Sequence, residues 1–397
     1  MPVCEVQQFK IDGNGKGITE PVTGKTNAEA FGEAAIAEDN GTAIGNDAQT
    51  TDDDGTAIGY NSRAPLSAVA VGKSASAGIQ GTAVGAGVAL SGINSVAVGC
   101  AASGTTKSVV IGVSAKGLEN GVAVGFGADA KKNATAIGET AFTDNEETVA
   151  VGRGAIARNA DSTAVGAGAT AAGDGSTAIG ESSSSGAANA PGTVAVGHLA
   201  SATALETVAV GDSSSAGEDY AIAIGQAAVS KLDSVAIGHD ALIVPAGPGL
   251  EGECVAVGNE AIAQGNFSTA VGKGASTGNS ESVAVGHEAN ASGLDSVAIG
   301  KGSLASVQDS IAIGAGSAAA NVGQAAIGSV SHPIVDFIVR GASAPDLNPI
   351  EAYSNPPANE AGLLILVNNG AVVSRVVKIG AANSGPGGAG RVLFVDN

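Results

Sequence analysis

Three histidines occupy one recurring position of this chain, directly after a glycine, and histidine is the commonest metal-binding side chain. They are His198, His239 and His287, each three repeats from the next. If one repeat rises about 4.8 Å, neighbouring histidines lie roughly 14 Å apart, too far to share an ion that needs ligands at about 2 Å. The same position elsewhere holds Tyr60 or Arg153. We therefore interpret it as a tolerant turn position and predict no metal site.

Phosphate binding and catalysis are not supported either. The run Gly72-Lys73-Ser74 is similar to the end of a phosphate-binding loop, but Ser67 replaces the required glycine and no helical pattern follows. Acidic runs at 52–54 and 144–147 are interpreted as solvated turns, with weak cation binding as the alternative. No nucleophile or carboxylate pair is placed to form a pocket. We predict no catalytic residue, no cofactor and no enzymatic activity.

All of these residues lie in a repeat whose most regular part typically ends in Ala, then Val or Ile, then Gly. Twenty-one copies occur between Gly45 and Gly328, and eighteen of the twenty spacings are 13 or 14 residues. A period this short is typical of one turn of a β-solenoid. Aromatic residues make up only 3% of the chain, so a wide globular core is not expected.

One repeat shows how each coil would fold. Period-two alternation places Val297 and Ile299 on one face of a strand and Ala298 on the other, so both faces are apolar. A strand without a polar face is expected to be buried on both sides. The second half of a repeat, such as 155–157, predicts a short strand with one solvent-facing side. The sequence thus predicts a flat two-strand coil with one uncovered apolar wall.

A neighbour must cover this wall, because the chain contains no long apolar helix that could do so. The simplest neighbour is the same surface on another copy, so we predict homo-oligomerisation about a shared axis. The predicted interface residues are Val96, Val98, Val235, Ile237, Val283, Val285, Val297 and Ile299.

The runs 94–99, 234–238 and 282–286 resemble the head repeat of trimeric autotransporter adhesins, the YadA-like head. The resemblance covers roughly residues 32–330. It implies an all-β fold, a left-handed parallel β-roll with two strands and 13–14 residues per coil. It also implies that three chains pack around a threefold axis, with the Val-Ala-Ile strand facing that axis.

The repeats divide the chain into three predicted domains. Residues 1–31, with a strand from Val3 to Ile11, form an N-terminal arm, either for docking onto a virion or as a frayed cap. Residues 32–330 form the rod. Residues 331–397 form a small β-domain that caps the rod, nucleates the trimer or contacts a receptor. Its expected strands are Ile334–Val339, Leu363–Val367, Val372–Ile379 and Val392–Val395.

Two longer spacings, from Gly180 to Gly197 and from Gly238 to Gly258, predict loops that emerge from the rod. The second loop is unusually apolar, and we predict that it packs on a neighbouring chain or serves as a contact site. Its residues are Leu242, Ile243 and Val244. Cys4, Cys100 and Cys254 are odd in number and far apart, so we expect free thiols.

The formal charge of −20 argues against nucleic acid and anionic membranes as partners, and no stretch approaches the ~20 apolar residues that span a bilayer. An export signal, a coiled-coil stalk and an anchor barrel are not recognised. We therefore predict a homotrimeric phage fibre, of head or tail, that mediates adhesion to the host surface. Its expected partners are itself, other virion proteins through a terminal segment, and a host receptor. The alternative is the head of a bacterial trimeric surface adhesin lacking its anchor.

Overall fold

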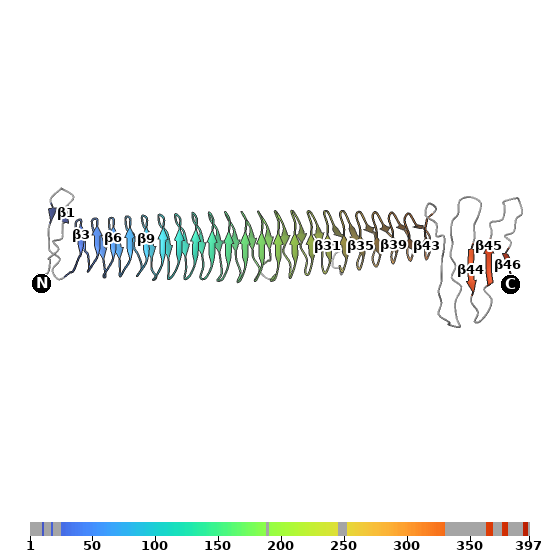
Figure 1. The fold of residues 1–397 in the computed structure, drawn as a ribbon, viewed down its shortest axis with the longest axis horizontal. Helices are drawn as coiled ribbons and strands as arrows, with labels where there is room; N and C mark the ends of the chain where they lie inside the picture. Colours follow the sequence, from blue (N-terminus) through green and yellow to red (C-terminus); the bar gives the residue numbers. More distant parts are fainter. Residues whose placement is uncertain are drawn as a thin grey trace. The chain divides into compact units, whose positions relative to one another are not determined.

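The computed structural model describes residues 10–11, 17–18, 25–187, 190–244, 252–329, 363–367, 375–379 and 392–395. All regular elements in these ranges are β-strands, and none of the described residues forms a helix able to cross a membrane. The chain divides into two compact units, Met1–Ser213 and Ser214–Asn397. Each unit contains a parallel β-solenoid in which the chain returns to the same two sheets once per repeat (Figure 1). The predicted all-β parallel solenoid is confirmed.

The strands that carry the repeated phrase form what we call the motif sheet. In the first unit its strands are β3 (Glu29–Phe31), β4 (Thr42–Ile44), β6 (Thr56–Ile58), β8 (Val69–Val71), β9 (Thr82–Val84), β11 (Val96–Val98), β13 (Val109–Ile111), β15 (Val122–Val124), β17 (Thr135–Ile137), β19 (Val149–Val151), β21 (Thr163–Val165), β23 (Thr177–Ile179), β25 (Val194–Val196) and β27 (Val208–Val210). In the second unit they are β29 (Ile222–Ile224), β31 (Val235–Ile237), β33 (Val255–Val257), β35 (Thr269–Val271), β37 (Val283–Val285), β39 (Val297–Ile299), β41 (Ile311–Ile313) and β43 (Ala325–Ile327).

The second half of each repeat contributes to what we call the opposite sheet. In the first unit its strands are β5 (Gln49–Thr50), β7 (Arg63–Ala64), β10 (Ala89–Leu90), β12 (Ser103–Gly104), β14 (Lys116–Gly117), β16 (Asp129–Ala130), β18 (Phe142–Thr143), β20 (Ile156–Ala157), β22 (Thr170–Ala171), β24 (Ser184–Ser185) and β26 (Ser201–Ala202). In the second unit they are β28 (Ser215–Ala216), β30 (Val229–Ser230), β32 (Leu242–Val244), β34 (Ile262–Gln264), β36 (Ser276–Thr277), β38 (Asn290–Ala291), β40 (Leu304–Ala305) and β42 (Ala318–Ala319).

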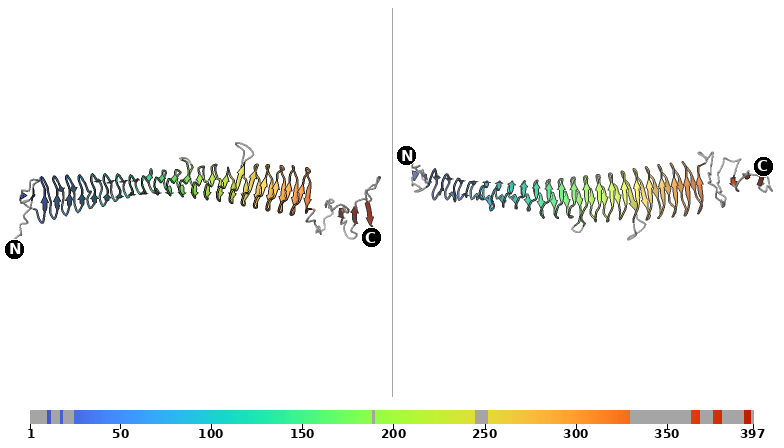
Figure 2. Two further views of the ribbon diagram at one scale, coloured as in Figure 1. Left: turned by 90° about the horizontal axis from the view of Figure 1, so that it is seen from above. Right: turned by 60° about the horizontal axis from the view of Figure 1, so that its bottom comes forward.

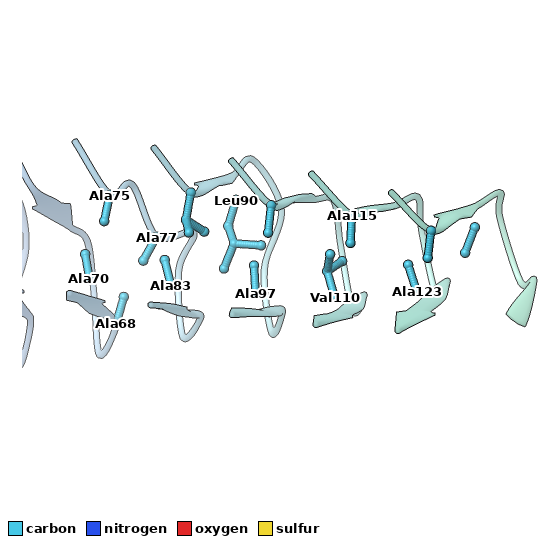
Figure 3. Packing of buried hydrophobic residues seen from close by; sticks show 14 of the residues in the cluster. Ala68, Ala70, Ala75, Ala77, Ala83, Leu90, Ala97, Val110, Ala115 and Ala123 are labelled. Atoms are coloured by element: carbon cyan, nitrogen blue, oxygen red, sulfur yellow. The ribbon is translucent and has the colours of Figure 1, made fainter. Parts of the chain in front are cut away.

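Alanine fills the narrow space between the two sheets. Ala83 and Ala97 from the motif sheet are fully buried, and so are Ala75 and Ala115 on the opposite side (Figure 3). Because the sheets are parallel and in register, equivalent residues of successive coils stack, as Ala83 does beside Ala97. Most of the side chains between sheets this close are small, which explains why the chain is rich in alanine and poor in aromatic residues.

The motif glycines allow each coil to close tightly. Gly138 has φ of 136°, a conformation that residues with a side chain rarely adopt. A Cβ atom at Gly138 would lie 2.3 Å from the carbonyl oxygen of Gly152 on the next coil. Glycine is therefore needed where each motif strand ends. At the other turn Asn120 and Asn133 take positive φ, both near 55°, which asparagine tolerates better than most residues.

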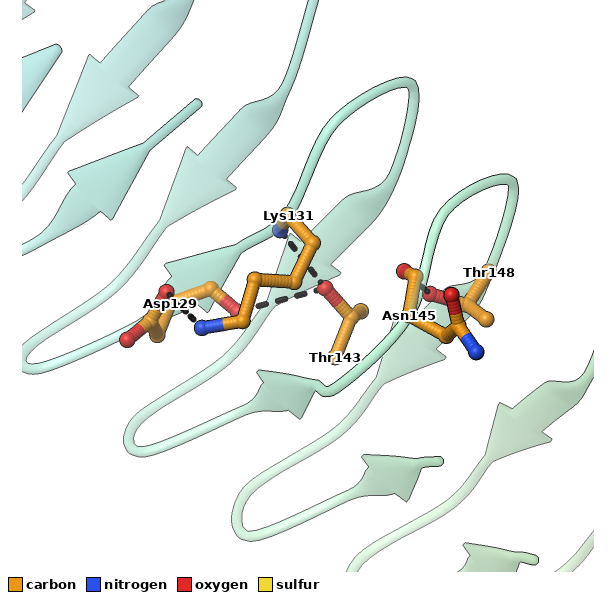
Figure 4. Close-up of polar contacts among 5 residues, drawn as sticks. All are labelled: Asp129, Lys131, Thr143, Asn145 and Thr148. Carbon is orange, nitrogen blue, oxygen red and sulfur yellow. Dashed lines mark hydrogen bonds and ion pairs between the residues drawn. The ribbon is translucent and has the colours of Figure 1, made fainter. Parts of the chain in front are cut away.

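Hydroxyl groups satisfy the backbone where the chain enters the motif sheet. The hydroxyl of buried Thr148 donates to the carbonyl of Asn145 at 2.8 Å (Figure 4). Ser282 and Ser296 repeat this contact in later coils, with distances of 2.6 and 2.7 Å. In the opposite sheet the Thr143 hydroxyl accepts from the backbone N–H of Lys131 at 2.9 Å. Where a serine or threonine stands before a motif strand, as in these coils, its hydroxyl therefore stabilises the turn.

The solenoid begins one coil earlier than predicted. β3 pairs in register with β4, and Ala30 is fully buried in the position of a motif alanine. Glu29 and Phe31 hide this coil from the repeat pattern because they stand where small or β-branched residues are usual. The boundary at residue 32 therefore moves toward the N-terminus. Lys10–Ile11 (β1) pairs antiparallel with Gly17–Ile18 (β2), and the rest of the predicted strand from Val3 lies outside the described residues.

Beyond the second solenoid the structure has three antiparallel strands, β44 (Leu363–Val367), β45 (Arg375–Ile379) and β46 (Val392–Val395). β44 and β46 match the predicted strands, whereas β45 starts at Arg375, and 372–374 lie outside the described residues. The predicted strand Ile334–Val339 also lies outside them. Cys100 and Cys254 are free thiols, as expected, and Cys4 is not described.

Candidate self-association surface

The first and third residues of each motif strand point away from the alanine core, and together they form what we call the Val/Ile face. All eight predicted interface residues lie on this face of their own unit. Val96 and Val98 are 37% and 38% exposed, and Ile237 and Ile299 are 37% and 39% exposed. The other predicted residues are half-buried, namely Val235, Val283, Val285 and Val297.

Register makes this face continuous within each unit. Val98 lies between Val84 and Ile111 on the neighbouring strands of the first unit. In the second unit Ile299 lies beside Val285 and Ile313 in the same way. Parallel in-register pairing places like side chains at one strand spacing, about 4.8 Å. The result is two parallel ladders made mostly of Val and Ile, with Thr at several first positions.

No charged side chain interrupts the Val/Ile face between β4 and β27 or between β29 and β43. Its positions hold only Val, Ile, Thr and Ala, as in Thr135 and Ala325. Single exposed aliphatic residues are common on protein surfaces, but a long contiguous apolar surface usually marks a contact site. Branched side chains with few rotamers also lose little entropy when they are covered.

The turn after each motif glycine borders this face, and it carries the histidines. His198 Nδ1 lies 3.0 Å from Asp212 Oδ2. The Ser213 hydroxyl and then His198 hydrogen-bond the Asp212 carboxylate, which lowers the pKa of Asp212. His239 Nδ1 lies 3.0 Å from Asp240 Oδ2. Among the described residues no group of three or more His, Cys, Asp or Glu is arranged to hold a metal ion.

The residues predicted to form an apolar contact loop do not lie in a loop. Leu242–Val244 is strand β32, which pairs with β34. Ile243 is 1% exposed because it points into the space between the sheets, so it cannot contact a partner. Leu242 and Val244 are half-buried on the outer side. The remainder of the insertion, 245–251, lies outside the described residues, and a contact role for it stays a prediction.

Comparison with known families identifies the repeat. The model of the YadA head domain repeat matches residues 38–62, 130–155, 157–183, 188–214, 202–228, 255–275, 279–303 and 291–317. The matched coils are therefore similar to YadA head repeats. A solved structure, the collagen-binding domain of the Yersinia adhesin YadA, is 24% identical and covers 44% of this chain and 68% of its own, with a TM-score of 0.20. No curated protein matches the chain.

Two features of the YadA-like coils were missed in the sequence. Threonine occupies several first positions of the Val/Ile face, as in Thr56 and Thr163, although only Val and Ile were named as interface residues. The signal was present, because β-branched threonine alternates with valine at this position. The coil at Glu29–Phe31 was missed because only its alanine and its closing glycine fit the repeat.

Proposed function

We propose that the chain is the head of a YadA-like adhesin in which three copies pack their Val/Ile faces around a common axis. The observation that supports this most is the uncharged aliphatic face, continuous within each unit and left in water by a single chain. Sister copies supply the same in-register ladder, so they can cover it without any other element. The count of three rests on the similarity to the YadA head repeat.

In this arrangement the opposite sheet and the turns remain on the outside and carry the adhesive contacts. The chain is displayed on a bacterial cell surface, and it binds molecules of a host rather than transforming them. We assign it no catalytic group and no cofactor. Specific recognition then comes from side chains that vary along the opposite sheet, because the Val/Ile face is committed to assembly.

The comparisons give the phage-fibre interpretation no support, and they favour the adhesin alternative. Docking onto virion proteins through residues 1–31 is therefore not part of this proposal. For the terminal strands β44 to β46 we retain all three predicted roles, which are capping the rod, nucleating the trimer and contacting a receptor.

The test uses the purified full chain. Light scattering measures its mass, and adhesion is measured to cultured epithelial cells and to immobilised matrix proteins, collagen among them. We expect a trimer that binds at least one of these surfaces, and an Ile299→Asp variant that is monomeric and binds much less. A monomeric wild type contradicts the assembly, and a trimer that binds none of these surfaces contradicts the adhesin role.

A further inference from the structure

Acidic residues are absent from one long stretch of this acidic chain. The protein has 38 Asp and Glu, yet none lies between Gly55 and Leu118. The same stretch contains Arg63, Lys73, Lys107 and Lys116. It folds as consecutive coils of the first unit, from β6 to β14, near its N-terminal end (Figure 2). These coils are therefore a positive band on a molecule of net charge −20.

Register brings two of these cations onto one flat surface. On the outer side of the opposite sheet the aligned residues are, in order, Arg63, Ser76, Ala89, Ser103 and Lys116. Four strand spacings separate the first from the last, about 19 Å at ~4.8 Å each. Only small side chains lie between the two cations, so nothing on this surface blocks a ligand that reaches both.

Both cations are available for a partner. Lys231 in the second unit pairs with Glu218 at 3.2 Å, and Lys132 pairs with Glu146 at 3.7 Å. Within the described part of the chain, no carboxylate forms such an ion pair with Arg63 or Lys116. The register neighbour of Lys116 on β16 is Asp129, whose carboxylate lies 3.6 Å from the Lys131 ammonium. Exposed cations outside an ion pair attract negative charge over roughly a Debye length, about 8 Å at physiological salt.

An aliphatic ridge borders the same surface. Leu66, Ile79 and Ile93 occupy equivalent turn positions on successive coils and are 37%, 41% and 44% exposed. Backbone hydrogen bonds hold these turns in line, since Gln80 N donates to Leu66 O at 2.9 Å and Asn94 N donates to Ile79 O at 3.0 Å. A ligand on this surface would therefore meet cations at both ends and apolar side chains along one edge.

We propose that this surface, the opposite-sheet row from Arg63 to Lys116 with the ridge at Leu66, Ile79 and Ile93, binds an acidic peptide segment of a partner protein. Carboxylates of the peptide reach the two cations, and its aliphatic side chains cover the ridge. A peptide of about six extended residues spans the row at ~3.3 Å per residue. Anionic polysaccharides match the charge but offer no aliphatic side chains for the ridge. An anionic membrane would also meet the strongly negative remainder of the chain.

This inference rests on the proposed function in one respect, because it takes the motif sheet as the covered face and the opposite sheet as the free one. The first experiment measures fluorescence anisotropy of a labelled peptide of glutamate, leucine and serine mixed with the full chain. We expect saturable binding that weakens with salt. A peptide with lysine in place of glutamate should not bind.

Matched variants locate the site. Arg63→Glu with Lys116→Glu should weaken binding about tenfold or more, the effect of losing roughly 1.4 kcal/mol. Lys273→Glu with Lys301→Glu changes the net charge equally on exposed turns of the second unit and should leave affinity within about twofold. Ile79→Ser should also weaken binding, whereas Leu294→Ser, at the equivalent turn position of the second unit and 39% exposed, should not.

Several results would overturn the inference. They are absence of saturable peptide binding, equal losses in the paired variants, or preferential binding of heparin fragments or phosphatidylserine vesicles through the same cations. Light scattering is recorded for every variant. If Arg63→Glu with Lys116→Glu lowers the mass of the assembly, the surface is a contact between copies. This result would contradict the peptide-binding inference but not the proposed trimer of the wild-type chain. A monomeric wild type that still binds the peptide contradicts the proposed function alone.

Discussion

Val110 packs directly against Gly117, and each explains the presence of the other. Val110 replaces the usual motif alanine and is fully buried. A Cβ atom at Gly117 would lie 2.8 Å from Val110 Cγ2, so the glycine leaves the room that the larger side chain takes. Gly104 on the preceding coil is similarly close, with 3.3 Å from its Cβ position to Val110 Cγ2. At this site the alanine core accommodates a larger residue because two of its neighbours are glycine.

This pairing predicts a measurable compensation. Gly117→Ala should destabilise the chain by about 1–3 kcal/mol, because the added methyl overlaps Val110 in a core that cannot expand. Adding Val110→Ala should recover part of the loss, with a coupling of about 1 kcal/mol or more. Urea unfolding of both single variants and the double variant measures this. Simple additivity would show that the two sites do not share space.

The motif glycines should be far less tolerant than the glycines of the following turn. Gly154 has φ of 63°, and a Cβ atom there would meet only Thr140 Oγ1, at 4.0 Å, so Gly154→Ala should cost about 1–2 kcal/mol for the backbone conformation alone. Gly138→Ala should cost about 3 kcal/mol or more, because its Cβ also meets the next coil. Thermal unfolding compares them. Equal losses at the two sites would contradict the close approach of successive coils.

Assembly should depend on the Val/Ile face and not on the turn beside it. Ile299→Asp places a charge in the middle of the aliphatic ladder, and burying it without a partner is costly, so the variant should remain monomeric. Lys301→Asp lies on an exposed turn of the same coil and should assemble normally. Sedimentation velocity separates the two outcomes. Equal behaviour of these variants would show that the faces have been assigned wrongly.

The Asp212 carboxylate should contribute to a pH-dependent part of stability. Its pKa is lowered by the Ser213 hydroxyl and by His198. A lowered folded-state pKa means that the contribution is present above the ordinary aspartate pKa and disappears as the pH falls through the lowered value. Asp212→Asn should therefore lower the unfolding temperature near neutral pH, and only slightly because the carboxylate is half exposed. In strong acid the wild-type carboxylate is protonated, so the substitution should have no such effect. Ser213→Ala should move the loss to higher pH. An unchanged difference across the pH range would contradict this account.

The repeat made most of the fold predictable. Alternation around Ala298 correctly indicated which residues face the core and which face outward, because a strand has a period of two and the coil has only two sheets. The closing glycines were equally clear. The boundaries of β44 and β46 also followed from short apolar runs between Gly-rich and Pro-rich segments.

Residues that break the repeat were harder to interpret. Leu242–Val244 was assigned to a loop because the spacing is long and the residues are large, yet Ile243 fills the core as part of β32. The spacing between successive motif glycines does not show whether the inserted residues come before or after the strand of the opposite sheet. The positive row from Arg63 to Lys116 was missed because its members lie on separate repeats and become neighbours only in the folded register.

The mass of the purified chain in solution tests the central claim most directly, because the proposed function depends on sister copies covering the Val/Ile face. Light scattering at low micromolar concentration should give three times the chain mass of 37.6 kDa, and Ile299→Asp should give a single chain mass. A stable, folded wild-type monomer of 37.6 kDa would contradict the account, because the aliphatic ladders would then be in contact with water in the native protein.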